Sequence, residues 1–248
     1  MFDVNVSPED QRLIDRTFTQ VRLSSFSGSV IRDTRDDPVE PTRGEYFSAN
    51  GQLAARAIGS EVGFFKTFFR ATDVRTVPNT RRVVFVANSY LGMATGFPRE
   101  DANGLPLVDP NTGEIARDLP QSERFYAGGD TTVRGFTLDT LGVRHTPPHP
   151  DDTIDKDGFP LGGNAVVIFN GELRLPAWRN AGVHGFVDTG NVFARVATID
   201  LGALRTAVGT GVYYKSPIGP IRFDLGFKVN RQPGESLTAW FLTFGQAF

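Results

Sequence analysis

The apolar and polar residues in the second half of the chain alternate with a period of two. The pattern is most regular in residues 221–229, IRFDLGFKV, where every second side chain is apolar. Because successive side chains of a β-strand point to opposite faces, this period predicts a strand with one apolar face. The same alternation predicts strands over residues 164–176, 183–193, 204–215 and 240–248.

A first set of strands is predicted before residue 96. Alternation begins at about Gln20 and is interrupted by short segments rich in Gly, Pro, Asn or charged residues, which predict turns. The predicted strands cover residues 20–32, 45–57, 62–72 and 83–92. Short connections favour antiparallel neighbours, because parallel strands need long crossovers. The whole chain is thus predicted to be all-β, with about nine antiparallel strands in residues 20–248.

The N-terminal residues follow a different pattern. Residues 1–19 are predicted to form a short helical leader, in which Ser7 caps the helix and Pro8 occupies its first turn. This segment has no basic region followed by an apolar core, so it is not a signal peptide.

Residues 96–163 form the long break in the strand pattern. They are polar and rich in Pro and Gly, and a loop of this length is usually functional. The stretch ERFYAGGDTTVRGF, residues 123–136, lies inside this loop and places Arg134 directly before Gly135 and Phe136. Our hypothesis is that the loop folds back into a membrane β-barrel and that Arg134 holds it there.

Charged residues of both signs gather on one face of the later predicted strands. They are Glu172, Arg174, Asp188, Arg205, Arg222 and Asp224. A soluble β-sandwich would present this face to water, whereas a barrel in lipid would turn it toward its lumen. The alternation alone does not distinguish these two folds.

Composition narrows the classes of protein. The 248 residues include 21 Phe, 27 Gly and 16 Pro, and no run approaches the roughly 20 apolar residues that a transmembrane helix needs. A transmembrane β-barrel is still compatible, because its strands show only short alternating patterns. The net charge of −2 gives no general electrostatic attraction for nucleic acid.

The candidate catalytic and metal-binding residues form no known site. Cysteine is absent, which excludes disulfides, thiolate metal sites and a cysteine nucleophile. The three histidines are accompanied by no nucleophile-elbow serine. The four aspartates of residues 151–157 lack the alternating spacing of a calcium loop. We therefore expect no enzyme, no metal and no cofactor.

Several stretches resemble, in the same order, segments of one known family. RFYAGGDTTVRGF resembles the conserved loop of the bacterial outer-membrane assembly and translocation barrels, the BamA- and TamA-type proteins of the bacterial surface antigen family. The other similar stretches are RDTRDDPVEPTRG (32–44), GGNAVVIFNGELRLP (162–176), GFVDTGNVF (185–193), YYKSPIGPIRFDLGF (213–227) and FLTFGQAF (241–248). They resemble a periplasmic turn of that family, the two strands after its loop, its last hairpin and its terminal strand.

The resemblance implies a fold and a function. The family has a 16-stranded antiparallel transmembrane barrel preceded by periplasmic POTRA domains, so this chain is expected to be a fragment that forms the C-terminal portion of such a barrel. The implied function is insertion or translocation of β-barrel or autotransporter-type clients at the bacterial outer membrane, with a seam that templates client strands. The alternatives are a two-partner secretion pore, a passive porin and a soluble β-sandwich.

The resemblance also implies partners. These are the lipid bilayer, unfolded outer-membrane clients and periplasmic or inner-membrane assembly proteins that would bind through POTRA domains. No nucleic acid partner is expected.

The functional residues implied by the resemblance are carried over by motif. The arginine of VRGF, here Arg134 with Gly135 and Phe136, would reach into the lumen and pair with Glu172 and Asp188 on the two following strands. The alternative is that these carboxylates pair only with Arg174 or Arg205.

The terminal strand carries a second implied site. Phe244, Gly245 and Phe248 resemble the C-terminal signal by which outer-membrane barrels are recognised for insertion. The alternative is that Phe248 is an aromatic residue at the membrane interface.

Overall fold

The computed structural model describes residues 21–80, 82–101, 105–108, 113, 115–216 and 219–244. The helical leader predicted for residues 1–19 lies outside these ranges, as do Gly245 and Phe248. Within the described ranges, no helix is both long and apolar enough to span a bilayer.

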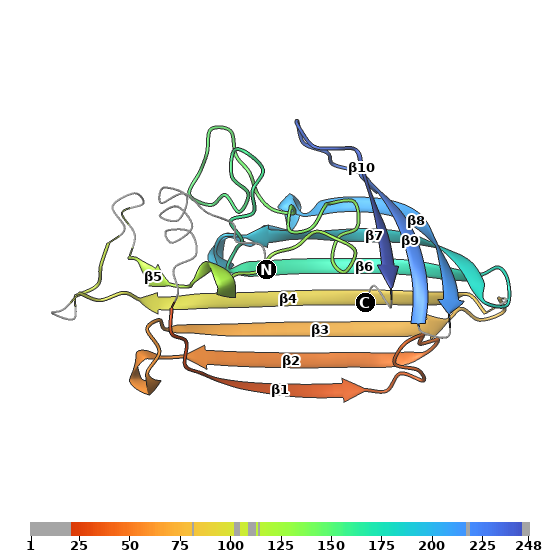
Figure 1. Ribbon diagram of the computed structural model, residues 1–248, viewed down its shortest axis with the longest axis horizontal. Helices are drawn as coiled ribbons and strands as arrows, with labels where there is room; N and C mark the ends of the chain where they lie inside the picture. Colours follow the sequence, from red (N-terminus) through yellow and green to blue (C-terminus); the bar gives the residue numbers. More distant parts are fainter. Residues whose placement is uncertain are drawn as a thin grey trace, which may run out of the picture.

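Nine long strands form one antiparallel sheet in the order β1-β2-β3-β4-β6-β7-β8-β9-β10 (Figure 1). Their bounds are β1 Ser25–Asp33, β2 Gly44–Ala54, β3 Phe64–Thr76, β4 Val84–Pro98, β6 Ala165–Pro176, β7 Ala181–Phe193, β8 Arg205–Ser216, β9 Gly219–Lys228 and β10 Thr238–Phe244. A short strand, β5 Arg117–Asp118, pairs with the end of β4. The predicted all-β antiparallel fold is confirmed.

The strand bounds differ from the prediction mainly at β4. This strand was expected to end near residue 92, but it continues to Pro98 and so includes the first residues of the predicted long loop. The extension pairs with the start of β3, where Phe64 lies opposite Gly96. The Gly and Pro residues of this segment favour a turn. The strand nevertheless continues, because it pairs with a strand about thirty residues away, which local preference does not register.

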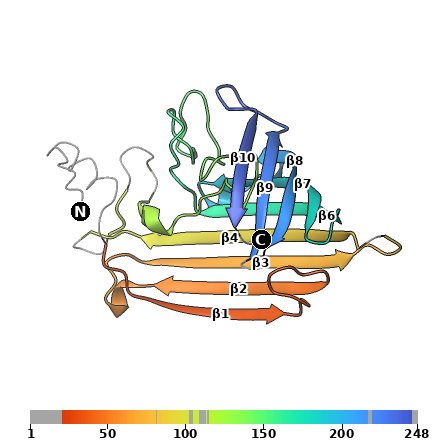
Figure 2. The ribbon, with the colours of Figure 1, turned by 45° about the vertical axis from the view of Figure 1, so that its right-hand side comes forward.

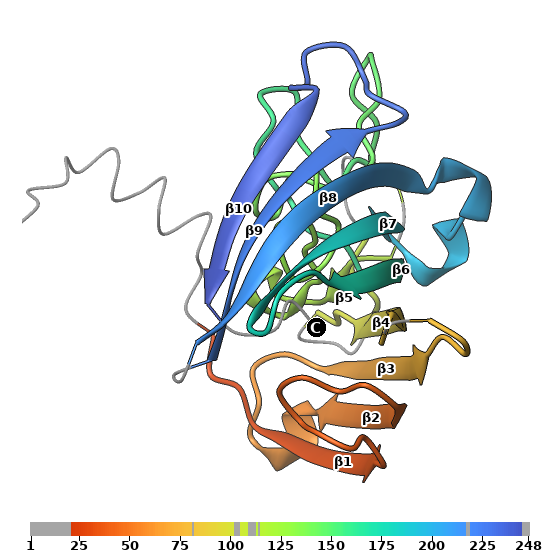
Figure 3. The ribbon, with the colours of Figure 1, turned by 90° about the vertical axis from the view of Figure 1, so that its right-hand side faces the viewer.

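The sheet is an open curve. Figure 3 looks along β1 to β4 and shows β7 to β10 rising over one side of the sheet, with the loop segments after β5 on the concave side. Figure 2 shows that β9 and β10 stand across the direction of β1 to β4. Among the described residues, β1 pairs only with β2 and β10 pairs only with β9. Both are therefore edge strands.

The connections at the two ends of the sheet differ in length. One end, which we name the turn end, carries the β1–β2, β3–β4, β6–β7 and β8–β9 connections. The opposite end, the loop end, carries the β2–β3, β4–β6, β7–β8 and β9–β10 connections, of which the one from β4 to β6 is by far the longest. Outer-membrane barrels have this asymmetry, with short turns on one side and long loops on the other.

The two faces of the sheet differ in polarity. On the concave face, many polar and charged residues are buried: Asn88, Asn170, Glu172, His184, Asp188, Arg205, Arg222, Asp224 and Lys228. On the convex face, large apolar residues are exposed, including Phe169, Leu173, Val183, Val187, Val212, Phe223 and Phe227. A soluble protein buries apolar groups and exposes charges, whereas a barrel in lipid has this reversed arrangement. The structure thus favours the barrel over the sandwich.

Candidate functional site

Backbone pairing closes segment 125–163 of the long loop, and an aromatic ring packs this closure on the sheet. Phe125 and Gly163 exchange two backbone hydrogen bonds, of 2.8 and 2.9 Å. The ring of Phe125 packs on β4 at Gly92, where an added Cβ would lie 2.6 Å from the ring carbon Cε1. Segment 125–163 therefore begins and ends next to the sheet.

An apolar cluster holds the middle of the loop against the concave face. From the loop it includes Phe125, Ala127, Val133, Phe136 and Leu141, all buried. From the sheet it includes Tyr90, Ala94, Val166, Ile168, Val192 and Ala207. Burying each large apolar side chain contributes about 1.5–3 kcal/mol, so the cluster favours a docked loop before any charge is considered.

Two close backbone contacts place the loop directly on β8 and β9. Gly135 has a φ of +121°, and a Cβ there would lie 2.6 Å from the Cβ of Ala207. On β9, a Cβ added at Gly226 would lie 2.7 Å from the backbone nitrogen of Gly135. Only glycine accommodates this φ and this approach without rearrangement. The glycine of the VRGF motif thus lets the preceding arginine reach the sheet.

Arg134 is completely buried and binds two carboxylates. Its Nε donates to Asp188 Oδ2 at 2.8 Å and its Nη2 to Asp188 Oδ1 at 3.0 Å. Its Nη1 donates to Glu172 Oε2 at 2.6 Å. Its backbone nitrogen also donates to Asp188 Oδ2, at 3.0 Å. A bidentate guanidinium–carboxylate pair fixes both distance and orientation, which a single point charge does not do.

The guanidinium also stacks on an aromatic ring. The Cζ atom of Arg134 lies 3.7 Å from the centroid of Phe186, on β7. The same ring also packs on Gly209 of β8, where a Cβ would clash with its atoms Cζ and Cε1. Arg134 is therefore held by ion pairs at its edge and by a cation–π contact at its face.

Glu172 is shared by three arginines. Besides Arg134, it accepts from Arg222 Nη2 at 2.7 Å and from Arg174 Nε at 2.7 Å. The pairing with Arg174, considered above as an alternative, therefore occurs together with the Arg134 contact. Arg205, the other alternative partner, instead donates to Glu235 Oε2 at 2.7 Å.

The cluster continues along β7 and β9. The imidazole Nε2 of His184 contacts Asp224 Oδ1, and Arg222 Nη2 lies 3.0 Å from the same nitrogen. We use the name ionic cluster for Arg134, Glu172, Arg174, His184, Asp188, Arg222 and Asp224. Apart from His184, it contains three arginines and three carboxylates, whose formal charges balance.

Sequence reasoning missed the roles of His184, Arg222 and Asp224. Arg222 and Asp224 had been assigned to the polar face of their strand, which was the available signal. The alternation gives the face of each residue but not which strands curl close enough for their side chains to meet.

Phe136 joins the loop to two further cations. Its buried ring lies 5.0 Å from the guanidinium carbon of Arg205 on β8 and 4.9 Å from Lys228 Nζ on β9. The same ammonium donates to the backbone oxygen of Ser236 at 2.9 Å. Phe136 is thus enclosed between β8, β9 and the connection that follows.

The loop also reaches the edge strand β10. Thr243 donates its hydroxyl to Asp130 Oδ2 at 2.8 Å, across 113 residues of sequence. On β6, Asn170 Nδ2 donates to the backbone oxygen of Thr132 at 2.6 Å. With the contacts above, the segment from Asp130 to Phe136 touches every strand from β6 to β10.

The predicted C-terminal signal is described only in part. Phe244 is 72% exposed on the convex face of β10, on the same face as Trp240 and Leu242. Gly245 and Phe248 lie outside the described residues.

The aspartates considered for calcium have structural roles within the loop. Asp152 accepts backbone hydrogen bonds from His145 and His149, both at 2.8 Å. Burial alone would raise the pKa of Asp152, but these bonds and the His145 side chain outweigh it and hold the pKa below its ordinary value. Asp155 accepts from the backbone nitrogens of Asp157 and Phe159. Among the described residues, no group of three acidic or histidine side chains is arranged to hold a metal ion.

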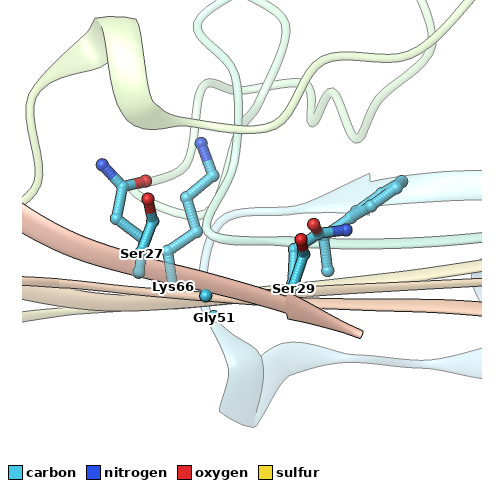
Figure 4. Close-up of a pocket in the computed structure, with 8 residues that line it drawn as sticks. Ser27, Ser29, Gly51 and Lys66 are labelled. Carbon is cyan, nitrogen blue, oxygen red and sulfur yellow. The ribbon is translucent and has the colours of Figure 1, made fainter. Parts of the chain in front are cut away.

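The opposite wall of the concave face is polar and uncharged. We define the polar wall as Ser27, Ser29, Asn50, Gln52 and the glycines between them on β1 and β2. Together with Lys66 and Phe68 of β3, these residues line a shallow pocket of about 240 Å³ (Figure 4). Lys66 extends toward the loop and contacts Glu123 at 3.2 Å. No residue of the ionic cluster lines this pocket.

Comparison with known proteins agrees with this architecture. A family model described as "Omp85 superfamily domain" matches residues 6–248. The chain is 24% identical over 247 residues to the outer membrane protein assembly factor BamA of Neisseria meningitidis, covering 88% of this chain and 28% of that protein. It is 26% identical over 217 residues to a SAM50-like protein of Schizosaccharomyces pombe, covering 82% and 39% respectively.

The fold is also similar to a solved structure. BamA from Haemophilus ducreyi lacking POTRA domains 1–3 matches with a TM-score of 0.66 and 21% identity, over 89% of this chain and 42% of that chain. The chain therefore spans less than half the length of each of these relatives.

Proposed function

Because the chain belongs to the Omp85 superfamily, we propose that it takes part in inserting β-barrel or autotransporter-type proteins into the bacterial outer membrane, with the VRGF loop bracing the lumen. The observation that carries this proposal is the complete burial of Arg134 between two carboxylates of β6 and β7. Relatives named as an assembly factor and as sorting and assembly machinery components support the assembly role.

The proposed brace acts on the strands next to one edge of the sheet. Segment 130–136 contacts β6 and β7 through ion pairs, β8 and β9 through glycine and aromatic contacts, and β10 through Thr243. Rigid strands up to β10 would hold the edge in one orientation while its backbone groups remain available. A client strand could then add to this edge by β-augmentation.

The ionic cluster favours this role over that of a passive porin. A porin conducts through a water-filled lumen, whereas here Arg134, Glu172, Asp188 and Asp224 are at most 1% exposed. A two-partner secretion pore of the same superfamily would have to displace the loop to pass a polypeptide. The tight contact of Gly226 with Gly135 supports a fixed loop instead.

We include the terminal strand in the proposal. Phe244, with Gly245 and Phe248, would form the signal by which the chain itself is inserted. The unfolded clients and the lipid bilayer are the proposed partners, with assembly proteins that would bind through POTRA domains.

Reconstitution tests the assembly role. The full chain is placed in liposomes, an unfolded outer-membrane barrel is added, and client folding is followed by its heat-modifiable mobility on a gel. We expect client folding to be faster than in empty liposomes, and faster than with Arg134→Ala in the same lipid. Equal rates for the chain and for empty liposomes would contradict the assembly function.

A further inference from the structure

A cavity of about 330 Å³ lies at the turn end of the sheet. Glu40, Pro41 and Thr42 of the β1–β2 turn form one side, and Trp178 and Arg179 of the β6–β7 turn form another. The β1–β2 turn reaches β8 across the opening, where Glu40 forms a salt bridge with Lys215. The cavity is therefore enclosed by turns from distant parts of the sheet.

Positive charge dominates the lining of this cavity. The basic lining residues are Arg82, Arg174, Arg179, Lys215 and Arg222, and the acidic one is Glu40. Arg174 and Arg222 are bound to Glu172, and Lys215 is bound to Glu40. Arg82 and Arg179 are exposed and have no ion pair within the described part of the chain. This excess of positive charge suits an anionic ligand.

An apolar groove of about 250 Å³ adjoins the cavity on the convex face. Its apolar lining comes from Val183, Val212, Ile221, Phe223 and Leu242. The cavity and the groove share Trp178, Ala181, Tyr213 and Arg222, so they meet at the rim of the sheet. One ligand could therefore place a charged group in the cavity and an apolar chain in the groove.

Aromatic residues mark this rim as a membrane interface. Trp178 is 75% exposed and Tyr214 is 50% exposed, and both line the groove. Tryptophan and tyrosine concentrate at the level of the lipid head groups in membrane proteins. The charged cavity would then lie at head-group depth and the groove at acyl-chain depth.

We propose that this rim binds an anionic phospholipid, with its phosphate among Arg82, Arg179 and Lys215 and one acyl chain along the convex groove. The proposal does not depend on the assembly function. It depends on the cavity, on its excess of basic side chains and on the adjoining groove.

Trp178 provides a direct test, because the chain contains only two tryptophans. In a Trp240→Phe background, the full chain is placed in phosphatidylcholine nanodiscs that contain brominated phosphatidylglycerol or brominated phosphatidylcholine. Bromine on an acyl chain quenches tryptophan fluorescence at contact. We expect phosphatidylglycerol to reach half-quenching at about one fifth of the mole fraction that phosphatidylcholine needs, the effect of about one basic residue near a membrane surface.

Variants that remove basic side chains test whether the lipid preference arises at the cavity. Arg82→Gln, Arg179→Gln and Lys215→Gln combined should abolish the preference for phosphatidylglycerol. Arg43→Gln is the matched control, because Arg43 is an exposed arginine of the same turn as Glu40 that does not line the cavity. If the triple variant loses its heat-modifiable mobility, Arg179→Gln alone serves, since this side chain is exposed.

Two results would overturn the proposal. The first is equal quenching by the two lipids; if inorganic phosphate then changes the fluorescence of Trp178 and chloride at equal ionic strength does not, the cavity is a site for soluble phosphate instead. The second is a preference that survives in folded charge variants.

Discussion

The two walls of the concave face differ in whether the long loop covers and binds them. On β6 to β9, the ionic cluster is buried under the loop and is bound to it through Arg134. On β1 and β2, the polar wall carries hydroxyl and amide groups, and every residue of β1 is exposed. A buried carboxylate needs a partner, whereas a serine or an asparagine can bind water. The charged wall therefore requires the loop and the polar wall does not.

Replacing Arg134 should have the largest effect on the stability of the charged wall. We expect Arg134→Ala to leave Glu172 and Asp188 short of positive charge and to destabilise the folded chain by about 3–5 kcal/mol. Urea unfolding from liposomes measures the change, and protease cleavage within residues 123–136 reports release of the loop. Arg134→Lys should restore only part of the loss, because an ammonium cannot make the bidentate contact.

Arg75→Ala is the control for this substitution. Arg75 is 72% exposed at its side chain and pairs with Asp73 on β3, so its loss should change stability by less than about 1 kcal/mol. Unchanged loop protection in a folded Arg134→Ala variant would refute the proposed lock.

Adding one methyl group to a strand under the loop and one to a strand away from it sharpens the comparison. At Gly226, alanine would place its Cβ 2.7 Å from the backbone of Gly135, and we expect a loss of about 1–3 kcal/mol. At Gly51 of β2, a Cβ would point to the convex face and meets nothing within 4 Å, so alanine should be within about 0.5 kcal/mol of neutral. Equal unfolding curves for the two variants would show that the loop does not press on β9.

The hydrogen bond between the loop and β10 should contribute less to the stability of the fold. We expect Thr243→Val to remove one hydrogen bond to Asp130, a change of about 1 kcal/mol. Amide hydrogen exchange should accelerate in β10 and stay unchanged in β1, which the loop segment 130–136 does not contact. Acceleration in both edge strands would indicate general destabilisation rather than loss of a local contact.

The smallest effect is expected in the β1–β2 turn at low pH. The hydroxyl of Thr42, with backbone N–H groups, lowers the pKa of Asp36 from 3.8 to about 2. Because the folded pKa lies below the ordinary value, this stabilisation is complete above about pH 4 and is lost as the pH falls through about 2. The protection of the Thr42 and Arg43 amides relative to their intrinsic exchange rates should therefore fall between pH 4 and pH 2, and Asp36→Asn should remove this pH dependence.

The sequence predicts the strands well, because alternation is a local signal. It assigned Glu172, Asp188, Arg222 and Asp224 to one face, and the structure has all four buried on the concave side. It did not predict the Arg222–His184–Asp224 contacts, nor the Asp130–Thr243 bond. These contacts join segments 38 to 113 residues apart, and they depend on the curvature of the sheet, which no local pattern encodes. The pairing of Arg134 was inferred from a family motif, since periodicity gives a loop residue no direction.

The close backbone contact between Gly135 and Gly226 has a consequence for the order of folding. The loop backbone occupies space directly against β9, so the β8–β9 hairpin closes over a docked loop more easily than a loop threads beneath a finished hairpin. The sequence separations agree with this order, at 38 and 54 residues from Arg134 to Glu172 and Asp188 but 113 from Asp130 to Thr243. Closing a shorter segment costs less chain entropy. We expect the strands on this side to be added outward from the loop, so that β10 joins after β6 to β9.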